Sequence, residues 1–484
     1  MGYWGLCVYD GIVAEVCSFT SRGCSSDVLA DLPLSMESFI KVVQRIEGRG
    51  LGPSPLTVVR SLRGVAYEGD AFVEHFLGDP DPFPSGENEA PMWDPTLSEF
   101  IHLMVRHRIV GQAREEGVVL GSDGTTVALG SLLLGIEAGL VAGAGESVSG
   151  LYSLTIARNL GLSFLHSQDS QILGPDGCWD NVTFPRVFTL SGPPSLATDA
   201  LVNGGMDGVL LGKYLSTHPL HALQLSTVLR DYYGLHPGGP PEGPHLISFQ
   251  RRDNFRRLVN GSVLQELVLG SLATLQRLGE AEDTGQAAAL EDVVKGGVQK
   301  FVHRYLECPV IIPRCQWGAR PYRGSPTQLS LPLAFMYIHH THTPRQPCLS
   351  FRQCTADMRA MQRFHQDVRR WDDIGYSFVA GSDGYIYEGR GWQWRGAHTR
   401  GHNTRGYGIA FVGDYTATLP ARRSLELVRE SLASCGVMAG WLTGNFTWHG
   451  HRQLVNTSCP GGALYLEIES WKQFRSRDQA ARHH

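Results

Sequence analysis

Apolar residues in the first 300 positions recur mainly at helical spacing. Five of them between Met36 and Ile46 lie three or four positions apart, which predicts an amphipathic helix over 36–46. A longer stripe from Leu290 to Tyr305 predicts the last helix of this part. Short apolar runs on either side of Asp123-Gly124 predict a hairpin. The pattern therefore favours a mostly helical region.

Strand and helix signals alternate in the last third of the chain. A helix is predicted from Thr355 to about Arg370, and Ser424 is predicted to cap the next one. Strands are predicted over 333–340, 376–380, 385–387 and 407–412. The expected fold class is α/β: a mixed C-terminal β-sheet with flanking helices, preceded by a mostly helical N-terminal region.

Residues that interrupt helices and strands, mainly Pro and Gly, indicate the expected domain organisation of the 484-residue chain. A Pro- and Gly-rich run over 237–244 marks a loop or linker, and a boundary is placed just before Cys308. We expect a poorly defined N-terminus over 1–34, a helical accessory region over 35–304, a sheet domain over 305–475 and a tail over 476–484.

Charge is distributed unevenly along the chain. Residues 301–484 hold 22 Lys and Arg against 13 Asp and Glu, whereas residues 1–300 hold 20 against 34. A positive C-terminal domain suits an anionic polymer such as a bacterial wall glycan. Nucleic acid is not expected as a partner, because Lys472 is the only lysine of this half and no basic run occurs.

Cysteine content and glycosylation sequons predict a secreted, extracellular protein. The chain has ten cysteines, more than a reducing compartment favours. Glycosylation is expected at Asn181, Asn260 and Asn445, whereas Asn456 is expected to be unmodified because it lies beside Cys459. The first residues do not form a clear signal peptide, and no membrane span is predicted.

Histidines and a cysteine near the C-terminus form a candidate zinc site. His449, His451 and Cys459 lie in a Gly- and Pro-bracketed segment, and the strand over 333–340 ends at His339-His340. Two imidazoles and a thiolate would leave one tetrahedral position open, as in catalytic zinc sites. By spacing alone, a polar surface loop and a cysteine bound in a disulfide are the competing interpretations.

The surrounding motifs resemble those of the peptidoglycan recognition proteins. The likeness covers about residues 305–475 and is closest to the long, secreted members of the family, which carry an extra N-terminal region. Its motifs, in order, are Ile338-His339-His340-Thr341, Asp373-Ile374-Gly375-Tyr376-Ser377-Phe378, Gly381-Ser382-Asp383-Gly384, Tyr387-Glu388-Gly389-Arg390-Gly391-Trp392, Gly396-Ala397-His398, Gly450-His451-Arg452 and Cys459-Pro460-Gly461.

This resemblance implies roles for individual residues. Zinc (Zn²⁺) would be held by His339 or its neighbour His340, by His451 and by Cys459, with His449 as a solvated loop residue. Tyr376 and Thr457 would be catalytic. The substrate groove would be lined by Trp392, Gln393, Trp394, Arg395, His398, Asn403 and Arg405. Disulfides would join Cys348 to Cys354 and Cys308 to Cys435, leaving the partner of Cys315 unknown.

The function that the resemblance implies is zinc-dependent hydrolysis of the amide between N-acetylmuramic acid and L-alanine in peptidoglycan or muropeptides, as part of innate defence. The alternative is a recognition module that binds peptidoglycan without cutting it. Retention of Cys459, Tyr376 and the histidines favours the enzyme.

Overall fold

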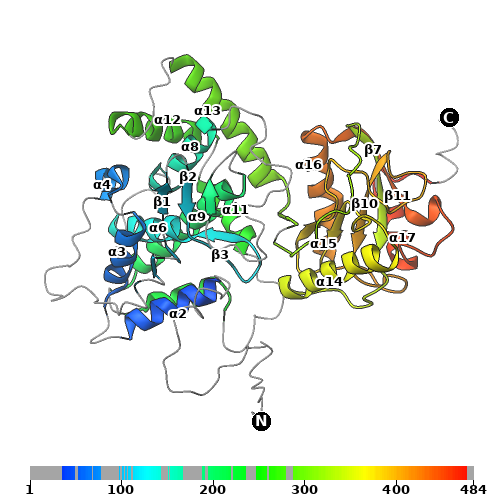
Figure 1. Cartoon of the computed structure of the whole chain (residues 1–484), viewed down its shortest axis with the longest axis horizontal. Helices are drawn as coiled ribbons and strands as arrows, with labels where there is room; N and C mark the ends of the chain where they lie inside the picture. The colour runs from blue at the N-terminus through cyan, green and yellow to red at the C-terminus, as the bar shows by residue number, and fades with distance from the viewer. Residues whose placement is uncertain are drawn as a thin grey trace, which may run out of the picture. The chain divides into compact units, whose positions relative to one another are not determined.

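The computed structural model describes residues 35–476 apart from internal gaps, the longest at 78–97, 167–187 and 236–246. Residues Leu34–His484 form one compact unit. Up to residue 307 the chain is largely helical (Figure 1). Its helices are α2 (Met36–Glu47), α3 (Pro55–Ala66), α4 (Ala71–Leu77), α6 (Leu129–Val141), α8 (Arg158–His166), α9 (Ser195–Ser216), α10 (Leu225–Tyr232), α11 (Ile247–Leu258), α12 (Gly261–Arg277) and α13 (Ala287–Val302).

Short strands and π-helical turns complete this region. They are β1 (His107–Val110), β2 (Ala113–Glu116), β3 (Val118–Leu120), β4 (Thr126–Ala128), β5 (Phe188–Leu190), η1 (Ser153–Ala157) and η2 (His303–Glu307). Strands β3 and β4 pair antiparallel around Asp123-Gly124, which confirms the predicted hairpin. The predicted helix over 36–46 is α2, capped by Ser35, and its five apolar residues are buried. The last predicted helix is α13 continued by η2, but Val293 lies outside its buried face and is 43% exposed.

Helices α6 and α9 pack closely because glycines face each other. A Cβ added at Gly135 would lie 2.9 Å from the Cα of Gly208, and one added at Gly139 would lie 2.8 Å from the Cα of Gly212. Real Cβ atoms do not approach other atoms so closely, so the backbones meet where no side chains intervene. Buried ion pairs link these helices to their neighbours, Arg63 with Glu137 at 2.5 Å and Arg251 with Asp207 at 2.7 Å.

A six-stranded mixed sheet forms the C-terminal domain, as predicted. Its order is β11-β7-β10-β8-β9-β6, with β8 and β9 antiparallel and the other pairs parallel. Its strands are β6 (Ile311–Ile312), β7 (Leu333–His340), β8 (Phe378–Ala380), β9 (Ile386–Glu388), β10 (Gly406–Phe411) and β11 (Leu442–Gly450). Helical segments pack around it (Figure 1): α14 (Phe351–Arg363), η3 (Phe364–Val368), α15 (Arg422–Glu426), η4 (Leu427–Leu432), α16 (Ala433–Met438), η5 (His451–Gln453) and α17 (Gly462–Glu469).

Two predicted helix starts are wrong. Helix α14 begins at Phe351 rather than Thr355, because Ser350 is the N-cap and its hydroxyl accepts from Gln353 N. Ser424 does not cap α15, whose N-cap is Ala421. The buried Ser424 hydroxyl instead donates to Gly381 O at 2.8 Å, tying the helix to the β8–β9 turn.

Polar and apolar contacts join the helical region to the sheet domain. The Tyr385 hydroxyl donates to Asp123 Oδ2 at 2.6 Å and lies 2.9 Å from the hydroxyl of Ser248. Phe249 packs against the core of the sheet domain, and the Arg423 guanidinium lies 3.6 Å from the centre of its ring. Asp123 and Ser248 of the helical region therefore share one buried hydrogen-bond network with Tyr385 of the sheet domain.

Among the described residues, no single helix is both long and apolar enough to cross a membrane. The segments Ile247–Arg256 and Gly261–Arg277 pass that test only as a pair bent by 90°.

Candidate metal centre

Strand β7 carries the first histidine of the site. Successive side chains of a strand point to opposite faces of the sheet. Met336 and Ile338 lie in the core that includes α17, so His340 shares their side, and His339 lies on the opposite side. The apolar run that predicts this strand thus also fixes the direction of His339.

The end of β11 and the loop after it supply the other two side chains. His451 begins η5 directly after Gly450, and Cys459 follows eight residues later. Arg452 N donates to Cys459 O at 3.0 Å, and the Arg452 guanidinium donates to Ser458 O. These contacts fold the loop back so that the thiol faces β7.

The structure brings His339, His451 and Cys459 together. One ligand atom from each lies within 4.8 Å of those of the other two. Cys459 Sγ lies 3.7 Å from His339 Nδ1, and the two imidazole centres are 4.3 Å apart. Within the described residues, Cys459 belongs to no disulfide, and buried His451 Nδ1 has no hydrogen-bond partner. Two nitrogens, one sulfur and an unpartnered buried lone pair fit a zinc ion.

Burial controls the protonation of this cluster. It holds the pKa of His339 well below the usual range, with His451 and His398 as further causes, and lowers the pKa of His451 to about 4. Both imidazoles are therefore neutral at pH 7, the form that ligates metals. Burial also raises the pKa of the Cys459 thiol to about 12, so metal binding must displace its proton.

Neither of the two neighbouring histidines joins the cluster. His340 Nδ1 accepts from Tyr415 N at 3.2 Å on the other side of the sheet, so of the two neighbours it is His339 that lies with His451 and Cys459. His449 Nε2 lies 2.9 Å from the Thr447 hydroxyl. His449 is 4% exposed, so it is a buried residue and not the solvated loop residue that was expected.

Tyr376 and Thr457 lie beside the cluster. The Tyr376 ring centre is 5.4 Å from that of His339, and burial, followed by the charge of Cys459, raises the pKa of its phenol. The phenol therefore stays protonated and can donate a hydrogen bond. The Thr457 hydroxyl accepts from Cys459 N at 3.2 Å, so it shapes the loop that carries the thiol.

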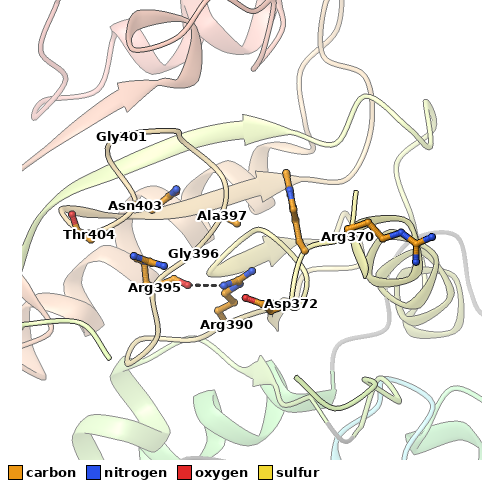
Figure 2. A pocket seen from close by; sticks show the side chains of 10 residues that line it. Arg370, Asp372, Arg390, Arg395, Gly396, Ala397, Gly401, Asn403 and Thr404 are labelled. Atoms are coloured by element: carbon orange, nitrogen blue, oxygen red, sulfur yellow. Dashed lines mark hydrogen bonds between the residues drawn. The ribbon is translucent and has the colours of Figure 1, made fainter. Parts of the chain in front are cut away.

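The sheet domain also has a pocket of about 410 Å³ that is rich in arginine (Figure 2). It is lined by Arg370, Trp371, Asp372, Arg390, Arg395, Gly396, Ala397, Gly401, Asn403 and Thr404. Arg390 donates to Arg395 O at 2.8 Å, and Ala397 N donates to Gly375 O at 2.8 Å, next to Tyr376. The pocket wall is thus continuous with the segment that presents Tyr376.

The predicted groove residues divide into three groups. Arg395 and Asn403 line the pocket, Gln393 and Trp394 are half-buried, and Arg405 is exposed. His398 is buried beside His339, with ring centres 5.3 Å apart. The Trp392 indole is 8% exposed and packs on Phe378 and Trp441, with ring centres 4.5 and 5.0 Å away, so in this structure it belongs to the core of the sheet domain.

Sequence reasoning missed several residues of the pocket and site. Arg370, Trp371 and Asp372 immediately precede the Asp373-Ile374-Gly375-Tyr376 motif, so their position in the chain was the available signal. Thr399, whose hydroxyl lies 3.3 Å from His339 Nε2, gave no signal beyond following His398.

Both expected disulfides are present, Cys308–Cys435 and Cys348–Cys354. Asn445 is exposed on β11, as a glycosylation acceptor must be, and Asn456 is also exposed. Asn181, Asn260 and Cys315 lie outside the described residues.

Comparisons with known proteins agree with this geometry. The family model described as N-acetylmuramoyl-L-alanine amidase matches residues 330–462. The mouse (Mus musculus) protein named N-acetylmuramoyl-L-alanine amidase is 42% identical over 440 residues, covering 78% of this chain and 82% of the mouse protein. Peptidoglycan-recognition protein LB of Drosophila melanogaster is 41% identical over 164 residues, covering 34% of this chain and 69% of the fly protein.

A solved structure of Drosophila PGRP-LB is 40% identical, with a TM-score of 0.33, and covers 34% of this chain and 96% of the fly chain. The likeness to the mouse protein extends over most of both sequences, well beyond the sheet domain. This chain therefore belongs to the peptidoglycan recognition protein family, among its long members named N-acetylmuramoyl-L-alanine amidase.

Proposed function

We propose that the C-terminal domain is a zinc-dependent amidase that cleaves the bond between the lactyl carbonyl of N-acetylmuramic acid and the nitrogen of L-alanine. The observation that carries this proposal is the convergence of His339, His451 and an unbridged Cys459 within 4.8 Å. Secretion and a role in innate defence belong to the same proposal, and the two disulfides support an oxidising compartment.

A zinc ion held by these three side chains would supply a Lewis acid and lower the pKa of water from about 15.7 to about 7. The protein supplies the remaining elements of the reaction. Neutral His339 and His451 offer lone pairs without carrying a competing positive charge. The protonated Tyr376 phenol can donate to the carbonyl oxygen as negative charge develops there.

The arginine-rich pocket is suited to the stem peptide. The exposed guanidinium groups of Arg370 and Arg395 provide donors for carboxylates, and the pocket wall runs into the Tyr376 segment. The buried Arg390 guanidinium already donates to Ile374 O and Arg395 O, so it shapes the pocket wall. A stem peptide bound there would extend toward the segment that presents Tyr376, because Ala397 of the pocket wall is hydrogen-bonded to Gly375.

The direct test incubates the purified full-length protein with soluble muropeptides, with and without a chelator, and detects released stem peptide by mass spectrometry. Cleavage that the chelator abolishes is the expected result. Binding without cleavage in the presence of zinc would instead assign the chain to the recognition modules. Cys459→Ser should lose turnover while the variant still binds muropeptide, and undiminished turnover would exclude the metal centre.

A further inference from the structure

Thr399 lies behind the candidate metal centre, with its hydroxyl between two imidazoles. The hydroxyl oxygen is 3.3 Å from His339 Nε2 and 3.0 Å from His398 Nδ1. Thr399 is 0% exposed, so water does not reach the hydroxyl. We propose that Thr399 is a positioning residue that fixes which ring nitrogen His339 presents to a metal, an inference that rests on the proposed zinc site.

The hydroxyl has one hydrogen, which restricts how the two imidazoles share it. A hydroxyl can donate to one neighbour and accept from the other. If His339 Nε2 carries its proton and donates to Thr399, the hydroxyl donates to His398 Nδ1, and His339 Nδ1 is left bare. That nitrogen is the one 3.7 Å from Cys459 Sγ. The reverse order would place the proton on His339 Nδ1 and block ligation.

The arrangement with the His339 proton on Nε2 is favoured whenever a metal binds the lone pair of His339 Nδ1. A neutral imidazole holds its single proton on the nitrogen that is not bound. The proton on Nε2 then needs an acceptor inside the protein, and among the described residues the Thr399 hydroxyl is the hydrogen-bond partner of that atom. Outer-sphere partners of this kind orient metal-bound histidines and strengthen their binding.

Neighbouring groups hold Thr399 and His398 in place. Asn403 Oδ1 accepts from both backbone nitrogens, His398 N at 2.9 Å and Thr399 N at 2.8 Å. The His398 ring lies between Gly396 and Gly408, and a Cβ at either glycine would overlap it. Asn403, predicted as a groove residue, therefore also clamps the loop that delivers the hydroxyl.

A matched set of variants separates the hydroxyl from the shape of the side chain. Thr399→Val keeps the branched shape and removes the hydroxyl, whereas Thr399→Ser keeps the hydroxyl and removes the methyl group. The affinity of each full-length variant for zinc is measured by competition with a chromophoric chelator, after circular dichroism has verified the fold. Loss of an outer-sphere partner typically weakens metal binding about 10–100-fold.

We expect Thr399→Val to bind zinc about 10–100-fold more weakly than the parent, and Thr399→Ser to bind close to the parent. Thr399→Ala replaces the valine variant if the latter does not fold. Equal zinc affinity of the folded hydroxyl-free variant and the parent would overturn the inference. A parent protein that binds no zinc would overturn the proposed function itself, so the two failures are distinguishable.

Discussion

At the scale of single residues, the candidate centre is defined by buried imidazoles that remain neutral. Burial lowers the pKa of His340, His365, His449 and His451 to about 4 and that of His398 to about 3. An uncharged His451 suits metal ligation, and the five neutral imidazoles together make the folded state sensitive to acid.

Stability of the metal-free protein should decrease as the pH falls from about 6.5 to about 4. In this window the unfolded chain binds protons at histidines that the folded chain keeps neutral, so protonation favours unfolding. Above this window the contribution to stability is fully present. Unfolding of chelator-treated protein in guanidinium chloride at several pH values measures the slope of the free energy of unfolding against pH.

His365→Gln provides the matched comparison for this slope, because His365 is buried and its Nδ1 accepts from Gly375 N at 3.2 Å. Removing one such histidine should reduce the slope by up to about 1.4 kcal/mol per pH unit. An unchanged slope in the variant would show that His365 has the same pKa in the folded and the unfolded protein.

Tyr376→Phe tests the donor role of the phenol. We expect kcat to fall on the order of 10²- to 10³-fold, the typical effect of removing one oxyanion donor, with KM and zinc affinity nearly unchanged. Steady-state kinetics on a muropeptide and chelator competition provide these quantities. A full loss of zinc affinity would show instead that the ring supports His339 structurally.

Motifs in the sequence identified the residues that now lie together, but not their surroundings. His451 and Cys459 stand next to Gly450 and Pro460, which mark a loop, and His339 follows an apolar run at the end of a strand. Their positions at a strand end and in a loop could therefore be predicted from the sequence. Trp392 and Thr399 are buried by contacts with residues distant in the chain, and no local pattern reports such contacts.

At the scale of elements, periodicity predicted the position of α2 because one buried face imposes a regular spacing, and an unbroken apolar run predicted β7. Periodicity failed at helix ends, where Ser350 and Ser424 look alike as capping residues. Only the hydroxyl's actual partner, Gln353 N for Ser350 and Gly381 O for Ser424, separates a cap from an interior helix residue.

The close packing of α6 and α9 could not be predicted from the sequence either, because the apolar residues over 130–140 show no clear helical spacing. Gly208→Ala should destabilise the protein by about 1–3 kcal/mol or more, because the added methyl meets the backbone of α6. Chemical denaturation measures the change in the free energy of unfolding.

Gly270→Ala is the control for this substitution. Gly270 lies inside α12, and an added Cβ would meet no atom within 4 Å, so alanine should stabilise by about 0.5–1 kcal/mol. Similar effects of the two substitutions would mean that helix propensity, and not interhelical contact, governs both sites.

At the scale of the whole molecule, the network around Tyr385 connects the helical region with the sheet domain. Tyr385→Phe removes the hydrogen bonds to Asp123 and Ser248 and leaves a buried carboxylate with one partner fewer. We expect a loss of about 1–3 kcal/mol and earlier proteolytic cleavage between the two regions.

Differential scanning calorimetry and limited proteolysis measure these effects. Tyr214→Phe is the control, because Tyr214 is 52% exposed on α9 and should tolerate the change. If Tyr385→Phe behaves as that control does, the hydrogen bonds of the Tyr385 hydroxyl do not help to hold the two regions together.

The disulfide between Cys308 and Cys435 spans 127 positions and encloses His339 and Tyr376, while His451 and Cys459 lie beyond it. A protease that nicks the chain once inside this covalent ring releases no fragment, and the halves that share the metal-binding set remain tethered. A cut upstream of Cys308, by contrast, lies outside this ring, so this bond does not hold the two sides of the cut together. The position of cleavage therefore decides whether the Cys308–Cys435 bond keeps the fragments in one molecule.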